Sequence, residues 1–200
     1  MLILSILLSI TPGKAAFASL FIPGSGDLML GEKKRAAYFL TAEAVTWAYY
    51  FGFCWEEGKV GNSSENFAAL YASANIQGKD ESYFESLENY ISSDEYNESV
   101  KEEARNLYPD TTASDILKER RDYIEEHIYT GENAWSWQST EAAKKYHELR
   151  VRKRDFGQKA VNMVGFAVLN RLVNFFVTYL AGERVSVEVK EDEIKLGVRF

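Results

Sequence analysis

The chain has little of the chemistry that most catalytic and metal sites need. Its 200 residues include one cysteine, Cys54, and two histidines, His127 and His147. A single cysteine excludes an internal disulfide framework and a cysteine-rich zinc or iron–sulfur site. The two histidines fall on different predicted helices, and neither has a serine or cysteine nearby at motif spacing. We therefore predict no metal, no cofactor and no catalytic residue, and the sequence gives no support for an enzyme.

Basic residues are also in the minority. There are 23 Lys and Arg against 30 Asp and Glu, which gives a net charge of -7 and argues against a nucleic-acid partner, because such a partner needs a basic face. The imbalance lies in the middle of the chain, where residues 56–157 hold 22 acids and 13 bases, a net charge of -9. Residues 1–55 carry only seven charged side chains. The chain is therefore apolar, then acidic, then apolar again.

Helix-breaking residues are rare in the apolar parts, so their one cluster is informative. Pro23, Gly24 and Gly26 interrupt an apolar stretch just before Asp27, which could cap the helix that follows. Residues 36–55 then supply twenty residues with a single charge and a cluster of aromatics at the end, as in a membrane-crossing helix. We predict a helical membrane hairpin broken at Pro23 to Gly26. The alternative is a buried helix of a soluble bundle.

The pattern predicts a mainly α fold that ends in a β-hairpin. The first ten residues, MLILSILLSI, are as apolar as a signal-peptide core, although they would also suit a first packed helix. Residues 183–200 alternate apolar and polar side chains, which is typical of two short strands. The predicted segments are a shortened signal segment (1–14), an apolar helical hairpin (15–55), an acidic aromatic-rich helical domain (56–138), a long helix with an apolar C-terminal half (139–182) and a β-hairpin (183–200).

A few polar residues stand out against the apolar segments. Glu43 and Arg171 are the lone charges of their apolar spans, and ionisable groups at such depth are costly unless they are paired. Asn170, Asn174 and Thr178 recur every four residues and so share one helix face. We predict a buried pair between Glu43 and Arg171, with Asn170 or Asn174 completing the hydrogen bonds.

Two further groups are candidates for binding. Arg150, Arg152, Lys153 and Arg154 could contact anionic lipid headgroups, or could pair with Glu148 and Asp155. Trp135 and Trp137 are of a residue type enriched at interfaces, so they could contact a partner or could close the core of the acidic domain.

Several segments together resemble an uncharacterised family of bacterial envelope proteins. They are SLFIPGSGDLMLGEKKRA, AEAVTW, GKDESYFESLENYISSDEYNESVKEEARNLYP, YTGENAWSWQSTEAAKKYHELR and VLNRLV. The first is similar to a domain of unknown function whose membrane hairpin carries Pro-Gly-x-Gly-Gln, and here Asp27 stands in place of the glutamine. The resemblance implies a location in the bacterial cell envelope and implies no activity, cofactor or catalytic residue.

These observations favour a small envelope protein whose helices anchor an acidic domain in the lipid bilayer, as a scaffold or adaptor. Its partner would be another protein, a second copy or the membrane surface. A membrane-embedded enzyme or transporter accessory with a polar cavity around Glu43 and Arg171 is the alternative, and a soluble helical bundle is a third reading. Lys33, Lys34 and Arg35 in a short loop favour a cytoplasmic location for that loop, with the acidic domain outside, although Arg150 to Arg154 favour the opposite.

Overall fold

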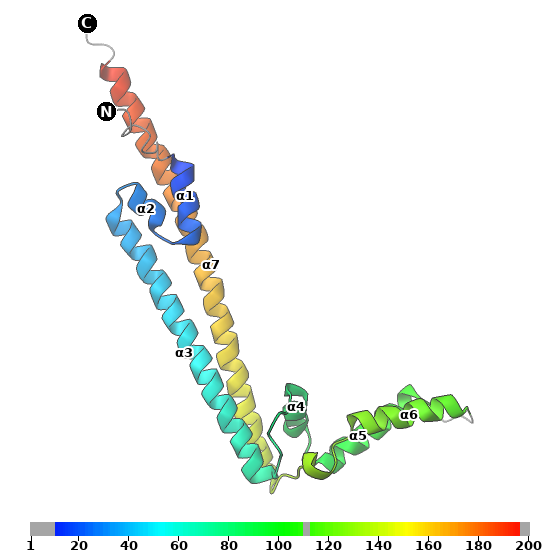
Figure 1. Cartoon of the computed structure of the whole chain (residues 1–200). Helices are drawn as coiled ribbons and strands as arrows, with labels where there is room; N and C mark the ends of the chain where they lie inside the picture. Colours follow the sequence, from blue (N-terminus) through cyan, green and yellow to red (C-terminus); the bar gives the residue numbers. More distant parts are fainter. Residues whose placement is uncertain (1–10, 110–112, 197–200) are drawn as a thin grey trace. The chain divides into compact units, whose positions relative to one another are not determined.

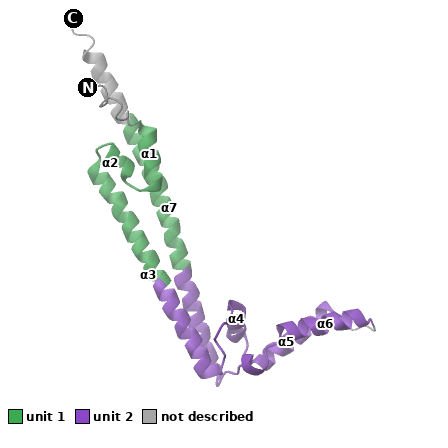
Figure 2. Cartoon of the chain, in the orientation of Figure 1, with its two compact units in different colours: residues 1–54, 158–200 green, residues 55–157 purple. Residues whose placement is uncertain are grey.

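The computed structural model describes the backbone of residues 11–109 and 113–196, and the side chains as far as residue 183. Within these residues the chain is helical and contains no strand, which confirms the mainly α class. It divides into two compact units, with unit 1 formed by Met1–Cys54 and Gln158–Phe200 and unit 2 by Trp55–Gly157 (Figure 2). Two long helices, α3 (Lys33–Ala72) and α7 (Thr140–Leu196), each contribute to both units.

Unit 1 joins two short helices to parts of the two long ones (Figure 1). The first, α1 (Pro12–Phe21), begins at Thr11, whose hydroxyl accepts a hydrogen bond from the Lys14 N–H at 3.4 Å. It ends because Pro23 forces the preceding residue out of the helical region, and Ile22 is extended. The second, α2 (Ser25–Met29), follows at once. The helical break predicted at Pro23 to Gly26 is therefore present.

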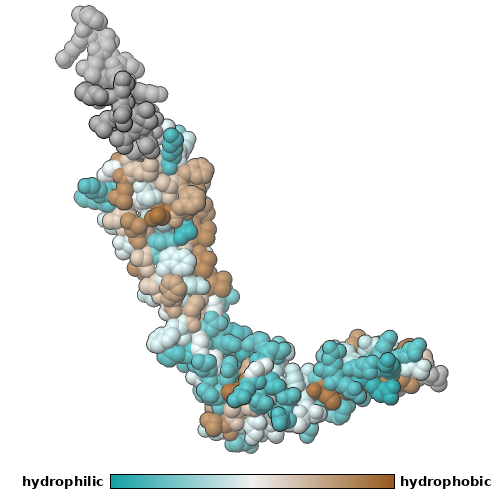
Figure 3. All heavy atoms as spheres, in the orientation of Figure 1, coloured by the Kyte–Doolittle hydropathy of each residue, from teal (hydrophilic) through white to brown (hydrophobic). Residues whose placement is uncertain are grey.

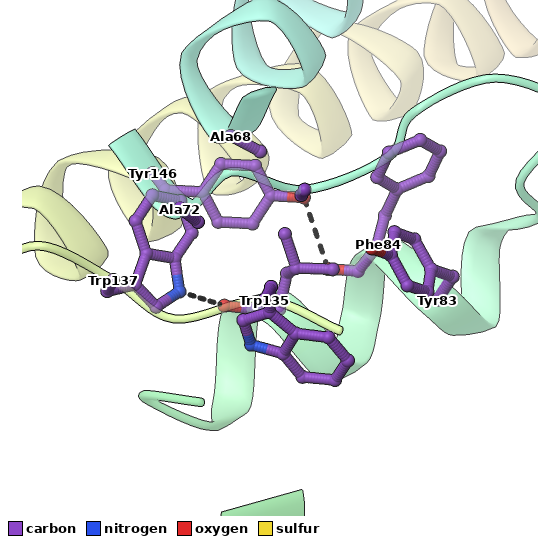
Figure 4. Close-up of a cluster of buried hydrophobic side chains, with 9 residues drawn as sticks. Ala68, Ala72, Tyr83, Phe84, Trp135, Trp137 and Tyr146 are labelled. Carbon is purple, nitrogen blue, oxygen red and sulfur yellow. Dashed lines mark hydrogen bonds between the residues drawn. The ribbon is translucent and has the colours of Figure 1, made fainter. Parts of the chain in front are cut away.

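Unit 2 adds three shorter helices, of which α4 and the start of α5 pack on an aromatic core and α6 packs on α5. Asp80 and Ser92 cap α4 (Glu81–Asn89) and α5 (Ser93–Leu107) by accepting hydrogen bonds from backbone N–H groups of the first turn. After α6 (Ser114–His127), a 3₁₀ turn (Gly131–Asn133) leads into an extended segment that returns to the core. In Figure 4 the Trp137 indole donates to the Leu87 carbonyl oxygen at 2.9 Å, and the Tyr146 hydroxyl to that of Phe84 at 3.2 Å.

The β-hairpin predicted for residues 183–200 is not supported, because α7 continues to Leu196. After Gly182 the chain has no proline or glycine up to Leu196, and the residues between the two expected strands, Lys190 to Glu193, are compatible with a helix. A helix that has already started gains one hydrogen bond for each residue added, so it extends easily. Residues 1–10, which make up most of the signal segment predicted for 1–14, and residues 197–200 lie outside the described part of the chain, whereas residues 12–14 begin α1.

The second helix of the predicted hairpin does not stop at residue 55. It continues as α3 to Ala72 through Gly58 and Gly61, and it takes in the first part of the segment predicted as the acidic helical domain (56–138). One helical glycine costs only about 1 kcal/mol, which packing can offset. Gly61 lies against α7, because a Cβ placed there would be in ordinary van der Waals contact, at 3.6 Å, with the Lys153 side chain.

Candidate functional site

A fully buried carboxylate, Asp27, lies at the centre of unit 1. Its Oδ1 accepts hydrogen bonds from Arg35 Nε at 2.6 Å and from Thr178 Oγ1 at 3.0 Å. Its Oδ2 accepts from Asn174 Nδ2 at 2.6 Å. Asp27, Asn174 and Thr178 have no accessible surface. A charge buried in this way persists only when it is paired and hydrogen-bonded, and here both oxygens are occupied by donors.

The same side chains also satisfy the backbone at the break between α1 and α2. The Gly24 N–H donates to Asn174 Oδ1 at 2.5 Å, and the Gly26 N–H donates to Ser19 Oγ at 3.2 Å. The hydroxyls of Ser19 and Thr178 lie 3.3 Å apart. Irregular backbone is tolerated inside a membrane only where protein groups or water satisfy it, and these bonds meet that condition.

Two glycines are required by the geometry of the break. Gly24 has φ +84°, a left-handed conformation that other residues adopt with strain, and a Cβ there would lie 2.6 Å from the Ala36 carbonyl oxygen. A Cβ on Gly26 would overlap the carbonyl oxygen of Ala15 in α1. The Pro-Gly-x-Gly pattern therefore brings α2 into contact with both α1 and α3.

A second polar centre surrounds Glu43 on α3. Its Oε1 accepts hydrogen bonds from Arg171 Nη2 at 2.7 Å and Nε at 3.2 Å, and from Trp47 Nε1 at 2.9 Å. Its Oε2 accepts from Asn170 Nδ2 at 3.0 Å, and the same amide also reaches the Phe39 carbonyl oxygen. The structure thus brings Glu43, Arg171 and Asn170 together. Asn174, the other expected partner, instead binds Asp27.

Neither centre offers a reactive group to a substrate. Both carboxylates are occupied by donors from the chain itself, and the part of the chain that the structure describes contains no group of three or more His, Cys, Asp or Glu residues that could hold a metal ion. The two centres have a structural role, because their hydrogen bonds and ion pairs hold α2 and α3 against α7 within an apolar unit.

The outer surface of unit 1 is apolar. Figure 3 shows hydrophobic side chains over much of its visible face, whereas unit 2 is mostly hydrophilic on that face. The exposed apolar residues include Phe17, Phe21, Ile22, Leu28, Leu40, Val45, Phe51, Val161, Phe166, Leu169, Leu172, Phe176 and Leu180. Among the described residues one helix, Thr140–Glu183, is long and apolar enough to cross a membrane, and only 17% of its apolar window is buried. The predicted span 36–55 lies in α3, which among the described helices is long enough but not apolar enough to cross a membrane.

The basic run on α7 is largely occupied by ion pairs within unit 2, so the predicted lipid contact is not supported for most of it. Arg150 is only 2% exposed and pairs with Glu81 and Glu88 of α4. Arg154 holds Glu88 with two hydrogen bonds of 2.7 Å, and Lys153 lies 3.1 Å from Glu81. The expected partners Glu148 and Asp155 are not the ones used by these pairs. Arg152 is exposed and stacks on the Phe156 ring.

Glu88 is the focus of this cluster. Burial favours the protonated form, but the hydrogen bonds and charge of Arg154, the charge of Arg150 and that of His147 outweigh burial and lower the pKa of Glu88 below its ordinary 4.5. The pKa of Glu81 is lowered for the corresponding reason, since Arg150 and Lys153 outweigh its burial. The cluster therefore holds α4 on α7.

Trp135 and Trp137 are 3% and 5% exposed and belong to the core, so their side chains offer little surface to a partner. Trp135 packs edge-on against Tyr83, and Trp137 against Tyr146 at 5.0 Å between ring centroids. The alternative reading, in which the aromatics close the domain, describes them correctly.

Sequence reasoning missed the role of Asp27 as a buried acceptor. Asp27 is an ionisable residue in an apolar stretch, the same signal that singled out Glu43, but its place beside the break suggested only a helix cap. Comparison of the chain with protein-family models, with curated proteins and with solved structures finds no match in any of the three.

Proposed function

We propose that this protein is a membrane-anchored adaptor of the bacterial envelope, with unit 1 embedded in the bilayer and unit 2 displayed in water. The observation that carries the proposal is the inverted polarity of unit 1. Its polar side chains Asp27, Asn174 and Thr178 are fully buried and hydrogen-bonded, while large apolar side chains cover its outside. Large exposed apolar patches on a protein mark contact with a membrane or with another protein.

The lengths of the helices agree with a bilayer. At 1.5 Å per residue, residues 33–54 of α3 extend about 33 Å and residues 158–183 of α7 about 39 Å, against a hydrocarbon core of ~30 Å. Within unit 1, Pro12 contacts Gly182 on α7 and Gly24 contacts Asn174, eight residues earlier on α7. The α1–α2 hairpin therefore extends about 12 Å along α7 and returns, as a re-entrant element would.

The basic residues indicate the orientation. Lys33, Lys34 and Arg35 follow the turn where the re-entrant hairpin ends, so the positive-inside rule places that turn in the cytoplasm. The chain leaves unit 1 at the opposite end of α3, and residues 55–157 would then be extracytoplasmic. The opposing basic run has less weight, because its members Arg150 and Arg154 are neutralised by α4.

Extraction and labelling test the anchoring and the orientation separately. The full chain should remain in the membrane pellet after alkaline carbonate and enter solution only with detergent. In a Cys54→Ser background, a cysteine at Ser114 should react in intact cells with a maleimide that does not cross the inner membrane, and one at Lys14 should react only after lysis. Release of the protein from the membrane by alkaline carbonate would contradict the anchoring. The reverse labelling pattern would contradict only the orientation.

The adaptor role rests on the acidic surface of unit 2, which has carboxylates but offers no reactive centre. Glu98, Glu102 and Glu103 are exposed on α5, and they suit a protein partner with a basic face. A cross-linked partner recovered from detergent extracts should be lost when these three residues are changed to Gln. Changing Glu141, Glu148 and Asp155 on α7 to their amides should preserve it. Equal recovery with both variants would contradict a role for the α5 surface.

The alternative reading, an enzyme or transporter accessory built around Glu43 and Arg171, is less well supported. Those two side chains bind each other and leave Glu43 with a donor on each oxygen. The soluble-bundle reading is weakened by the low burial of the apolar part of α7, because the core helix of a soluble protein is mostly buried.

A further inference from the structure

One end of unit 1 carries three exposed lysines that form no ion pair with any of the described residues. Lys33 and Lys34 begin α3, and Lys14 lies in the first turn of α1. The start of α1 and the turn between α2 and α3 lie at the same end of the unit (Figure 1). These three lysines form the basic patch of unit 1.

These lysines differ from the two arginines of the buried polar centres and from most of the basic run on α7. Arg35 is bound to Asp27, Arg171 to Glu43, and Arg150 and Arg154 to Glu88. Most of the basic run on α7 is therefore already paired with carboxylates of the chain. Lys33 and Lys34 have no such partner among the described residues, where the exposed Glu32 is their neighbour in sequence, so they are available to an external anion.

The position of these lysines on α3 is unfavourable for the isolated chain. The positive end of the helix dipole lies at the N-terminus, so acidic residues stabilise a first turn and cations destabilise it. The first turn of α3 contains no acidic residue. An anion placed against Lys33 and Lys34 would remove their mutual repulsion as well as their repulsion from the dipole.

If unit 1 is embedded as proposed above, on which this inference depends, the patch lies at the level of the lipid headgroups. We infer that Lys33 and Lys34, supported by Lys14, bind the phosphate of an anionic phospholipid in the cytoplasmic leaflet. The same helices expose Leu28 and Tyr38, which would contact acyl chains. A lipid therefore matches both the charged and the apolar parts of this surface, whereas free phosphate matches only the first.

Spin-labelled lipids test the inference on the full chain. The protein is reconstituted into phosphatidylcholine vesicles that contain a trace of chain-labelled phosphatidylglycerol or chain-labelled phosphatidylcholine, and the immobilised fraction gives their relative association constant. Wild-type protein should prefer phosphatidylglycerol, and Lys33→Gln with Lys34→Gln should reduce the preference by about fivefold for each lysine removed. Lys144→Gln with Lys145→Gln, which removes two adjacent exposed lysines of unit 2, should leave the preference unchanged.

The other outcomes overturn the inference. Equal association of the two lipids with wild-type protein would exclude an anionic-lipid site, although successful insertion would leave the anchoring intact. Failure to insert into either vesicle would instead contradict the anchoring itself. Loss of the preference in inorganic phosphate, but not in chloride of equal ionic strength, would assign the patch to a free phosphate ion rather than to a lipid.

Discussion

Asn174 accepts a hydrogen bond from the Gly24 N–H at 2.5 Å, and thereby joins two parts of the chain that are 150 residues apart in sequence. Its amide nitrogen donates to Asp27 Oδ2 at 2.6 Å. One side chain thus supplies both an acceptor to the interrupted backbone and a donor to the buried carboxylate.

Changing Asn174 to Ala should therefore destabilise unit 1 strongly. The change leaves a buried N–H and a buried carboxylate oxygen each without a partner, and each unsatisfied group costs about 1 to 3 kcal/mol. Thermal unfolding of the detergent-solubilised protein measures the effect. Asn162→Ala on the exposed face of α7 is the matched control and should change the midpoint little. Equal midpoints for the two variants would contradict the role given to Asn174.

Gly26→Ala should also be destabilising, by about 1 to 3 kcal/mol, because the added methyl group overlaps the backbone of α1 at Ala15 and lies 2.5 Å from Ser19 Oγ. Gly52→Ala, in the part of α3 that belongs to unit 1, meets nothing within 4 Å. It should be neutral or should stabilise the helix by about 0.5 to 1 kcal/mol. Thermal unfolding of the detergent-solubilised protein compares the two variants. A Gly26→Ala variant as stable as wild type would show that α1 and α2 are not in close contact.

Glu43 and Arg171 should behave as a coupled pair. Glu43→Leu and Arg171→Leu should each destabilise the protein, and the double variant should recover much of the loss, with a coupling energy of about 0.5 to 3 kcal/mol. Strict additivity of the two changes would show that the pair contributes no interaction energy. A double variant that is stable but loses a cellular activity would instead favour the enzyme or transporter alternative.

Unit 2 should lose stability in acid. The pKa values of Glu81 and Glu88 are lower in the folded chain than their ordinary 4.5, so these carboxylates contribute stability above that pH and lose it as the pH falls through their folded values. Tryptophan fluorescence during urea unfolding at pH 7 and below pH 4.5 measures the loss. Glu88→Gln should destabilise at pH 7 by about 1.5 to 3 kcal/mol and reduce the dependence on pH.

The control for that change is Glu148→Gln, which removes an exposed carboxylate paired with Lys145. Such surface pairs contribute about 0 to 1 kcal/mol, so the pH dependence should stay as in wild type. An identical pH profile for Glu88→Gln and wild type would show that Glu88 does not sense the arginines around it.

Ser73 offers a stabilising change. It follows the last residue of α3 with φ 54°, the left-handed conformation that costs a non-glycine residue about 1 to 2 kcal/mol. Ser73→Gly should raise the unfolding midpoint. Ser73→Val, which adds a β-branched side chain in the same conformation, should lower it. If Ser73→Gly were less stable than Ser73→Val, backbone strain at this helix end would be ruled out.

The sequence predicted those features that depend on local chemistry. Pro23 keeps the residue before it out of the helical region and Gly24 takes a left-handed conformation, so together they interrupt a helix. Lone charges such as Glu43 and Arg171 in apolar spans need a partner. It could not assign Asn174 correctly, because Asn170 and Asn174 share one face of α7 and only the packed structure decides which carboxylate each one meets. The β-hairpin prediction was wrong because alternation over residues 185–198 does not outweigh the extension of a helix that has already started.

The contacts of Asn174 also have a consequence for the order of synthesis. Residues 12–32 leave the ribosome with the Gly24 N–H and the Oδ2 atom of Asp27 unmatched, because their partner Asn174 is made about 150 residues later. At ~5 to 20 residues per second that interval lasts roughly 7 to 30 s. If unit 1 is embedded in a bilayer as proposed, the nascent hairpin stays in contact with water or with the insertion machinery during this time, and it settles in lipid only after the last apolar helix has emerged.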